Sequence, residues 1–249
     1  MRSDKPSEKN TKVPSAITHP EHHLPGHQAR LNWLRAGVLG ADDGIVSVSG
    51  LVIGVASATT HSGVILTAGL AGIIAGAISM AAGEYVSVNS QRDSEEALLE
   101  KEKYELKHFP KEELDELTGL YEAKGLSKKT ARLVAEELSK GDPYKAHIDA
   151  ELGIDPDNLS NAWHAAGASA FAFLLGSIIP MLAILLPPEG LRIPITFVSV
   201  LITLAITGVI SARLGRASVT RAVIRVVAGG AIAMVVTYSI GRLFGVEGI

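Results

Sequence analysis

The chain has 249 residues and no cysteine, which excludes disulfide bonds, thiolate metal sites and a cysteine nucleophile. Hydrophobic residues make up 47% of the chain, and the formal net charge is −3 at pH 7. This charge, and the lack of a basic stretch interleaved with aromatic residues, argues against a nucleic-acid-binding protein. The composition fits either a large soluble domain or a small membrane protein.

Residues 1–30 are polar and rich in Pro, Ser and Lys, without the apolar core that a secretory signal requires. We expect a flexible cytosolic tail here. Four of the eight histidines lie in this segment and could capture a transition metal, but the prolines disfavour a fixed ligand geometry and favour a solvated tail. These histidines are His19, His22, His23 and His27.

Five apolar runs follow, each long enough to cross a bilayer at about 1.5 Å per residue. They cover residues 31–60, 64–90, 162–186, 193–213 and 219–243. The connection between the last two runs carries Arg213, Arg216, Arg221 and Arg225. Such a concentration predicts that it faces the cytosol, where it could also contact anionic membrane lipid. The N-terminus then lies in the cytosol too, and an odd number of spans leaves the C-terminus outside.

Charge is concentrated between the second and third runs. The interval 92–157 holds 18 of the 26 acidic residues and 11 of the 23 basic ones, a net charge of minus seven. The predicted fold is therefore an all-α polytopic membrane protein with five transmembrane helices and an inserted cytosolic acidic domain of three to four helices. Its parts are the tail (1–30), helices 1 and 2 (31–91), the acidic domain (92–160) and helices 3 to 5 (161–249).

Acidic residues interrupt the first two apolar runs. If Arg35 and Arg92 mark one membrane face, Asp43 and Glu84 each lie eight residues inward, about 12 Å deep and at one level. Met80 lies one helical turn deeper on the same face as Glu84. A carboxylate at membrane depth costs about 2.5–3.5 kcal/mol, so we interpret these three residues as a cation site. The alternatives are that they only bond neighbouring helices, or that the aspartate lies nearer the headgroups.

The second run also carries a seam of small residues, Gly69, Gly72 and Gly76, which lets another helix approach closely. Two five-span subunits would enclose a path across the membrane more easily than one, so we predict a homodimer. Packing of this seam within one subunit is the alternative.

In the acidic domain, the second run should continue as a helix past Arg92 and end near Phe109-Pro110. Glutamates then recur at a spacing of three residues, so a helical hairpin about this break could bring two pairs together. The pairs are Glu102 with Glu105 and Glu113 with Glu116. Like charges so arranged repel, and a bridging cation would relieve the repulsion.

A further helix is predicted over Ser127–Lys140, because Ser127 is a good N-cap. After Pro143, a short helix places His147 and Glu151 on one face. Carboxylates with one imidazole suit Fe(II) or Mn(II) better than Cu(I), which prefers sulfur. The alternative is an ordinary solvated acidic surface whose glutamates pair with nearby lysines.

Four segments resemble motifs of the vacuolar iron transporter family, in the order in which that family carries them. They are Trp33-Leu34-Arg35-Ala36-Gly37-Val38-Leu39-Gly40-Ala41-Asp42-Asp43-Gly44, Ser79-Met80-Ala81-Ala82-Gly83-Glu84-Tyr85-Val86-Ser87-Val88-Asn89-Ser90-Gln91, Glu151-Leu152-Gly153-Ile154 and Gly176-Ser177-Ile178-Ile179-Pro180. The similarity spans about residues 30–245, and the first two motifs are long enough to be specific.

The resemblance implies a dimer of five-span subunits that exports Fe(II), often with Mn(II), from the cytosol in exchange for protons. It implies that Asp43 and Met80 bind metal in the membrane, and that a set of cytosolic glutamates collects it: Glu102, Glu105, Glu113, Glu116 and Glu151. Two positions depart from the family pattern. Asp42 stands where Asn is common, which adds a charge, and His147 stands where some members have Met, which removes a soft ligand.

We therefore predict a divalent metal transporter that uses no cofactor, in a prokaryotic plasma membrane or, if eukaryotic, a vacuolar membrane. Two alternatives remain. A membrane-anchored metal buffer or sensor would bind metal without moving it, and a selective channel would conduct without a proton gradient. An enzyme is not expected, because the sequence shows no nucleophile–base constellation or phosphate-binding loop.

Overall fold

The computed structural model of the chain describes residues 27–156, 159–215 and 217–245, and these residues form helices without any strand. The elements are α1 (His27–Ala58), α2 (Ser62–His108), α3 (Pro110–Ala123), α4 (Lys128–Gly141), α5 (Pro143–His147), the π-helix η1 (Ile148–Leu152), α6 (Ala162–Leu185), the 3-10 helix η2 (Glu189–Leu191), α7 (Arg192–Leu214) and α8 (Val219–Phe244). The predicted all-α class is confirmed. The predicted tail, with His19, His22 and His23, lies outside the described residues apart from its last four positions.

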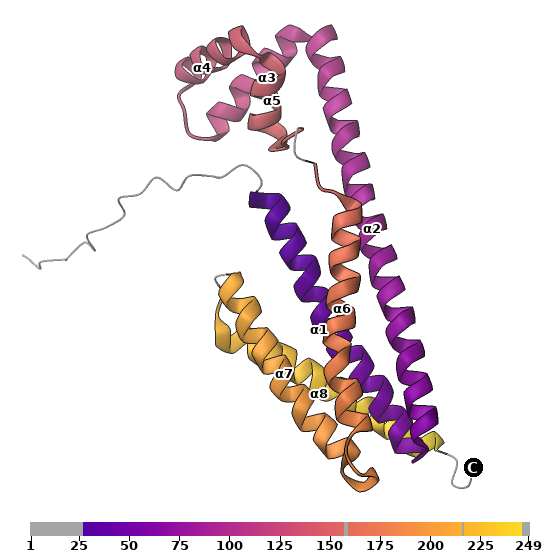
Figure 1. Cartoon of the computed structure of the whole chain (residues 1–249). Coiled ribbons are helices and arrows are strands. Elements are labelled where there is room, and N and C mark those ends of the chain that lie inside the picture. Colours follow the sequence, from indigo (N-terminus) through magenta and orange to yellow (C-terminus); the bar gives the residue numbers. More distant parts are fainter. Residues whose placement is uncertain (1–26, 157–158, 216, 246–249) are drawn as a thin grey trace, which may run out of the picture.

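Within this described part, five helices are long and apolar enough to cross a membrane: α1, α2, α6, α7 and α8. Each coincides with one predicted run, and the ends agree to within a few residues except where α2 continues. The start of α1 and the end of α8 lie at opposite ends of the bundle, as an odd number of spans requires (Figure 1). The chain is a multi-pass membrane protein.

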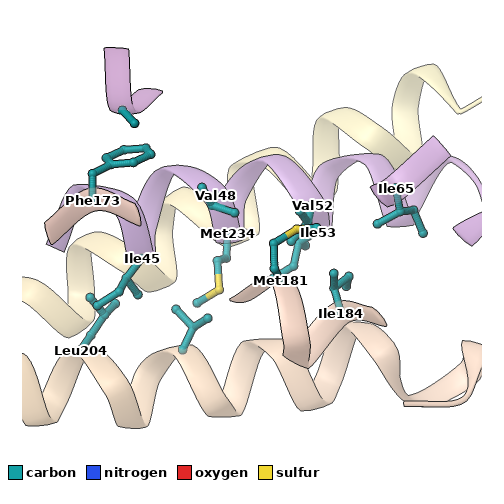
Figure 2. Packing of buried hydrophobic residues seen from close by; sticks show 12 residues of the cluster. Ile45, Val48, Val52, Ile53, Ile65, Phe173, Met181, Ile184, Leu204 and Met234 are labelled. Carbon is teal, nitrogen blue, oxygen red and sulfur yellow. The ribbon is translucent and has the colours of Figure 1, made fainter. Parts of the chain in front are cut away.

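α1 and α6 are the most closely packed pair of helices. A side chain at Gly44 would collide with the backbone carbonyl of Phe173, and one at Gly176 with that of Ala41. Because glycine has no Cβ, the two backbones can approach to this separation. The buried side chains of α1 continue this core, and Ile45, Val48, Val52 and Ile53 belong to one hydrophobic cluster with Leu204 of α7 and Met234 of α8 (Figure 2).

The small residues of α2 pack within the chain. A side chain at Gly69 would collide with Met181, one at Gly72 with Leu51 and one at Gly76 with Phe173. These partners belong to α1 and α6 of the same chain. The glycine seam therefore fits the alternative, packing within one subunit. The homodimer loses this support and stays a prediction.

α2 has 47 residues and continues well past Arg92, as the sequence indicates. It ends at His108, and Pro110 begins α3 at a position where the missing N–H costs nothing. The side chain of Ser127 accepts a hydrogen bond from the backbone N–H of Thr130 and caps α4, also as predicted. Figure 1 shows α3, α4 and α5 gathered beside the far end of α2, beyond the apolar helices. The boundaries at residues 92 and 160 stay a prediction.

Candidate metal centre

Four elements bring three carboxylates and one imidazole together in the acidic domain. Glu102 comes from α2, Glu113 from α3, His147 from the last position of α5 and Glu151 from η1. The reversal at Phe109 turns α3 back along α2. Asp142 then caps α5 by accepting a hydrogen bond from the backbone N–H of Lys145, which fixes where that helix begins. We call these four residues the acid–histidine cluster.

The cluster is centred on the Nδ1 atom of His147. This atom lies 2.9 Å from Oε1 of Glu102, 3.5 Å from Oε2 of Glu113 and 3.9 Å from Oε2 of Glu151. One ligand atom each of Glu102, His147 and Glu151 lies within 4.8 Å of the other two. Bonds of about 2.0–2.2 Å to a shared ion require separations only slightly smaller.

All four of these atoms are buried and make no hydrogen bond of acceptable geometry. The side chains of Glu102 and His147 are 4% and 1% exposed. Burial raises the pKa of Glu102 to about 7, and the neighbouring carboxylates add to that rise. Burial likewise raises the pKa of Glu113 and Glu151 and lowers the pKa of His147, so the domain disfavours every charged form.

A divalent cation would relieve the repulsion between these carboxylates and bind their oxygen atoms. Buried acceptors that converge without donors are costly, and three carboxylates repel one another unless they bind protons or a cation. The donor set is oxygen with one nitrogen, which suits hard or borderline divalent metals.

The other two predicted glutamates take different positions. Glu105 forms an ion pair with Lys101 at 3.1 Å, and Glu116 is exposed. Both still act on the cluster through space, because their charges contribute to the raised pKa values of Glu102 and Glu113. The structure thus places Glu105 and Glu116 beside the cluster, outside the convergent set.

In the apolar bundle, Asp43 and Met80 line one cavity of about 290 Å³, with walls from α1, α2 and α6. We call it the Asp43 cavity. Ser47, one turn along α1, donates a hydrogen bond of 2.7 Å from its hydroxyl to Oδ1 of Asp43. Sequence reasoning did not single out Ser47, although its spacing of four residues from the aspartate places it on the same helical face. Phe173 closes the cavity from α6.

Glu84 does not line this cavity. It lies 3.8 Å from Arg35, in an ion pair whose acidic side chain is 12% exposed. The structure brings together the predicted aspartate and methionine and places the predicted glutamate with an arginine.

Comparison with known proteins gives a consistent result. The model of the VIT family matches residues 34–242 of the chain. A vacuolar iron transporter of Acanthamoeba castellanii is 45% identical over 220 residues, covering 85% of this chain and 78% of that protein. Vacuolar iron transporter homolog 5 of rice is 37% identical, covering 89% and 85% of the two chains. Vacuolar iron transporter homolog 2 of Arabidopsis thaliana is 33% identical over 90% of each. The chain therefore belongs to the VIT family, whose members are transporters and not enzymes.

Proposed function

We propose that the protein exports Fe(II), with Mn(II) as a second substrate, from the cytosol across its membrane in exchange for protons. The names of its relatives support iron as the cargo. The observation that carries the proposal is the acid–histidine cluster, in which three carboxylates and one imidazole converge out of contact with solvent and make no hydrogen bond of acceptable geometry. A divalent cation would bind such a ligand set.

α2 connects the two candidate sites. It carries Glu102 of the cluster and Met80 of the Asp43 cavity on one uninterrupted helix. At 1.5 Å per residue these positions are about 33 Å apart. We infer that the cluster collects metal on the cytosolic side and that Asp43 and Met80 receive it in the membrane.

Exchange for protons follows from competition at the carboxylates. Burial raises the pKa of the cluster glutamates, while a bound dication favours their ionised form, so metal and protons displace one another. The same competition at Asp43 would couple metal release to proton uptake on the far side.

A homodimer is part of the proposal. One chain supplies one carboxylate and one thioether to the Asp43 cavity, beside the hydroxyls of Ser47 and Ser79, and a second copy would double that ligand set. We place the N-terminus and the acidic domain in the cytosol and the C-terminus outside. The membrane is a prokaryotic plasma membrane or, in a eukaryote, a vacuolar membrane.

Transport into proteoliposomes tests the proposal. Fe(II) uptake should depend on an imposed pH gradient and should be lost in Asp43→Ala. Metal that binds the outside of sealed vesicles without entering them would instead indicate a buffer or sensor. Uptake that is indifferent to the pH gradient would indicate a channel.

A further inference from the structure

Asp42 and Asp43 are adjacent in the chain but face different cavities. Successive residues on a helix point about 100° apart. Asp43 faces the cavity that Met80 lines, whereas Asp42 faces a separate cavity of about 870 Å³ between α1, α6 and α7. No residue lines both. We call the larger one the Asp42 cavity, and the proposed function makes no use of it.

The Asp42 cavity is long and mostly apolar. Its α6 wall extends from Trp163 to Leu175, a length of about 18 Å at 1.5 Å per residue. Trp163, the second residue of α6, is 73% exposed, and α6 begins at the end of the bundle nearest the acidic domain (Figure 1). Val38, Phe171 and Ile210 add apolar walls. The volume lies within the range of about 300–1,000 Å³ that is typical of sites for small organic molecules.

The polar groups of this cavity are few and unbalanced in charge. Apart from the indole of Trp163, they are the carboxylate of Asp42, the hydroxyl of Thr207 and the imidazole of His164, and no Lys or Arg lines the walls. The side chain of Thr207 lies within hydrogen-bonding reach of the carboxylate, but Oδ1 of Asp42 is buried and makes no hydrogen bond of acceptable geometry. A carboxylate in apolar surroundings is costly without a cationic partner. Oδ1 of Asp42 therefore lacks a hydrogen-bond donor.

We propose that the Asp42 cavity is a binding site for a protonated amphipathic primary amine, whose ammonium group pairs with Asp42. The ammonium donates to the unpartnered Oδ1, and the apolar body of the ligand lies along Phe171, Leu175 and Ile210. A metal ion fits poorly, because a single carboxylate among hydrocarbon walls cannot replace its hydration shell. The site is independent of the proposed transport of metal.

The occupant is a free amine rather than a phospholipid headgroup. Asp42 lies seven residues beyond Arg35, about 10 Å further along α1. A phospholipid would have to draw its ammonium that far below the membrane surface to reach the carboxylate. A small amine can enter from the exposed side of the cavity, where Trp163 and Phe171 are 73% and 62% exposed.

Binding of 4-phenylbutylamine to the full chain in phosphatidylcholine nanodiscs tests the proposal, with the neutral 4-phenylbutanol as the matched ligand. The fluorescence of Trp163 reports occupancy in a Trp33→Phe background, since the chain has two tryptophans. Saturable amine binding is expected. Asp42→Asn should weaken it about tenfold or more, the value of a charged hydrogen bond, and should leave the alcohol unaffected.

Two further variants separate the site from general electrostatics. Asp43→Asn removes the same charge one residue along and should leave amine binding unchanged. Gly167→Leu should block both ligands, because Gly167 lines the cavity and a Cβ added there meets no atom within 4 Å. The proposal is overturned if Asp42→Asn binds the amine as wild type does, if Asp43→Asn weakens it equally, or if Gly167→Leu has no effect. Displacement of the amine by phosphatidylethanolamine would overturn the choice of a free amine as occupant.

Discussion

The acid–histidine cluster and the Asp43 cavity both gather possible metal ligands, but only the first is complete within one chain. The cluster holds three carboxylates and an imidazole whose ligand atoms converge and make no hydrogen bond of acceptable geometry. In the Asp43 cavity the aspartate already accepts a hydrogen bond from Ser47, and Met80 adds one soft ligand. A buried site with several converging ligands retains an ion, whereas a site with few ligands releases it readily. The difference suggests capture in the acidic domain and transit in the membrane.

The strongest test of this division is Asp43→Asn, which removes the charge and keeps the shape. Fe(II) transport into proteoliposomes should fall at least about a hundredfold, because losing a ligand exceeds the 10- to 100-fold cost of losing a supporting group at a metal site. Equilibrium Fe(II) binding at the acid–histidine cluster should stay unchanged, since the cluster is intact. Transport at the wild-type rate would remove Asp43 from the path.

The converse variant is Glu102→Gln combined with Glu151→Gln. It should weaken metal binding about tenfold or more and raise the KM of transport by a similar factor, because two of the convergent ligands lose their charge. The maximal rate should stay within about threefold of wild type if the cluster only collects metal. Glu112→Gln is a matched control, since Glu112 is exposed on α3 and is not part of the cluster. A collapse of the maximal rate would place the cluster in the transit step.

The surroundings of the Asp43 cavity and the acidic domain also differ in how closely their glycines are packed. Gly76→Ala puts a methyl group against the ring of Phe173, which is 1% exposed, and should cost about 1–3 kcal/mol of stability while narrowing the Asp43 cavity. Gly119→Ala in α3 meets no atom within 4 Å and should be neutral or stabilising by up to about 1 kcal/mol. Thermal unfolding and transport of both variants check this. If Gly76→Ala left the stability unchanged, the ring of Phe173 would be able to move aside at little cost.

The extent to which sequence predicted these regions follows from the physics of each. Apolar runs predicted the spans, because a long hydrophobic segment leaves few alternatives to a membrane helix. The break at Pro110 and the cap at Ser127 are local signals, and both were correct. The α2 glycines predicted a close approach but not its partner, since the same small residues serve contacts within and between subunits.

Convergence in space was harder to predict. Spacing paired His147 with Glu151 on one helical face, but the contact of His147 with Glu102 depends on how α5 packs against α2. Glu105 and Glu116 share their spacing pattern with cluster members and still lie outside the convergent set. For Glu84, equal depth with Asp43 suggested a shared site, yet Arg35 on the facing helix became its partner. Periodicity gives the face of a helix, and tertiary packing decides what that face meets.

The smallest expected effect is a pH dependence confined to the cluster. Burial holds the pKa of Glu102 at about 7 against its usual 4.5, so the folded state binds more protons than the unfolded state between these values. The contribution of Glu102 to stability is therefore fully present below about pH 4.5 and is lost as the pH rises through 7. The pKa of His147 is lowered by burial, which acts in the opposite sense, but only below its usual value of 6.5.

Between about pH 6.5 and 8, therefore, the glutamates alone should lower the Tm of the metal-free protein as the pH rises. Added Mn(II) should cancel that loss, because it binds the ionised carboxylates. Glu102→Gln should flatten the pH dependence of the metal-free Tm and reduce the Mn(II) effect. Asp43→Asn should preserve both, since its cavity lies in another region of the molecule. If Asp43→Asn flattened the curve and Glu102→Gln did not, the site that binds metal most tightly would lie in the membrane, and the roles assigned to the two regions would be reversed.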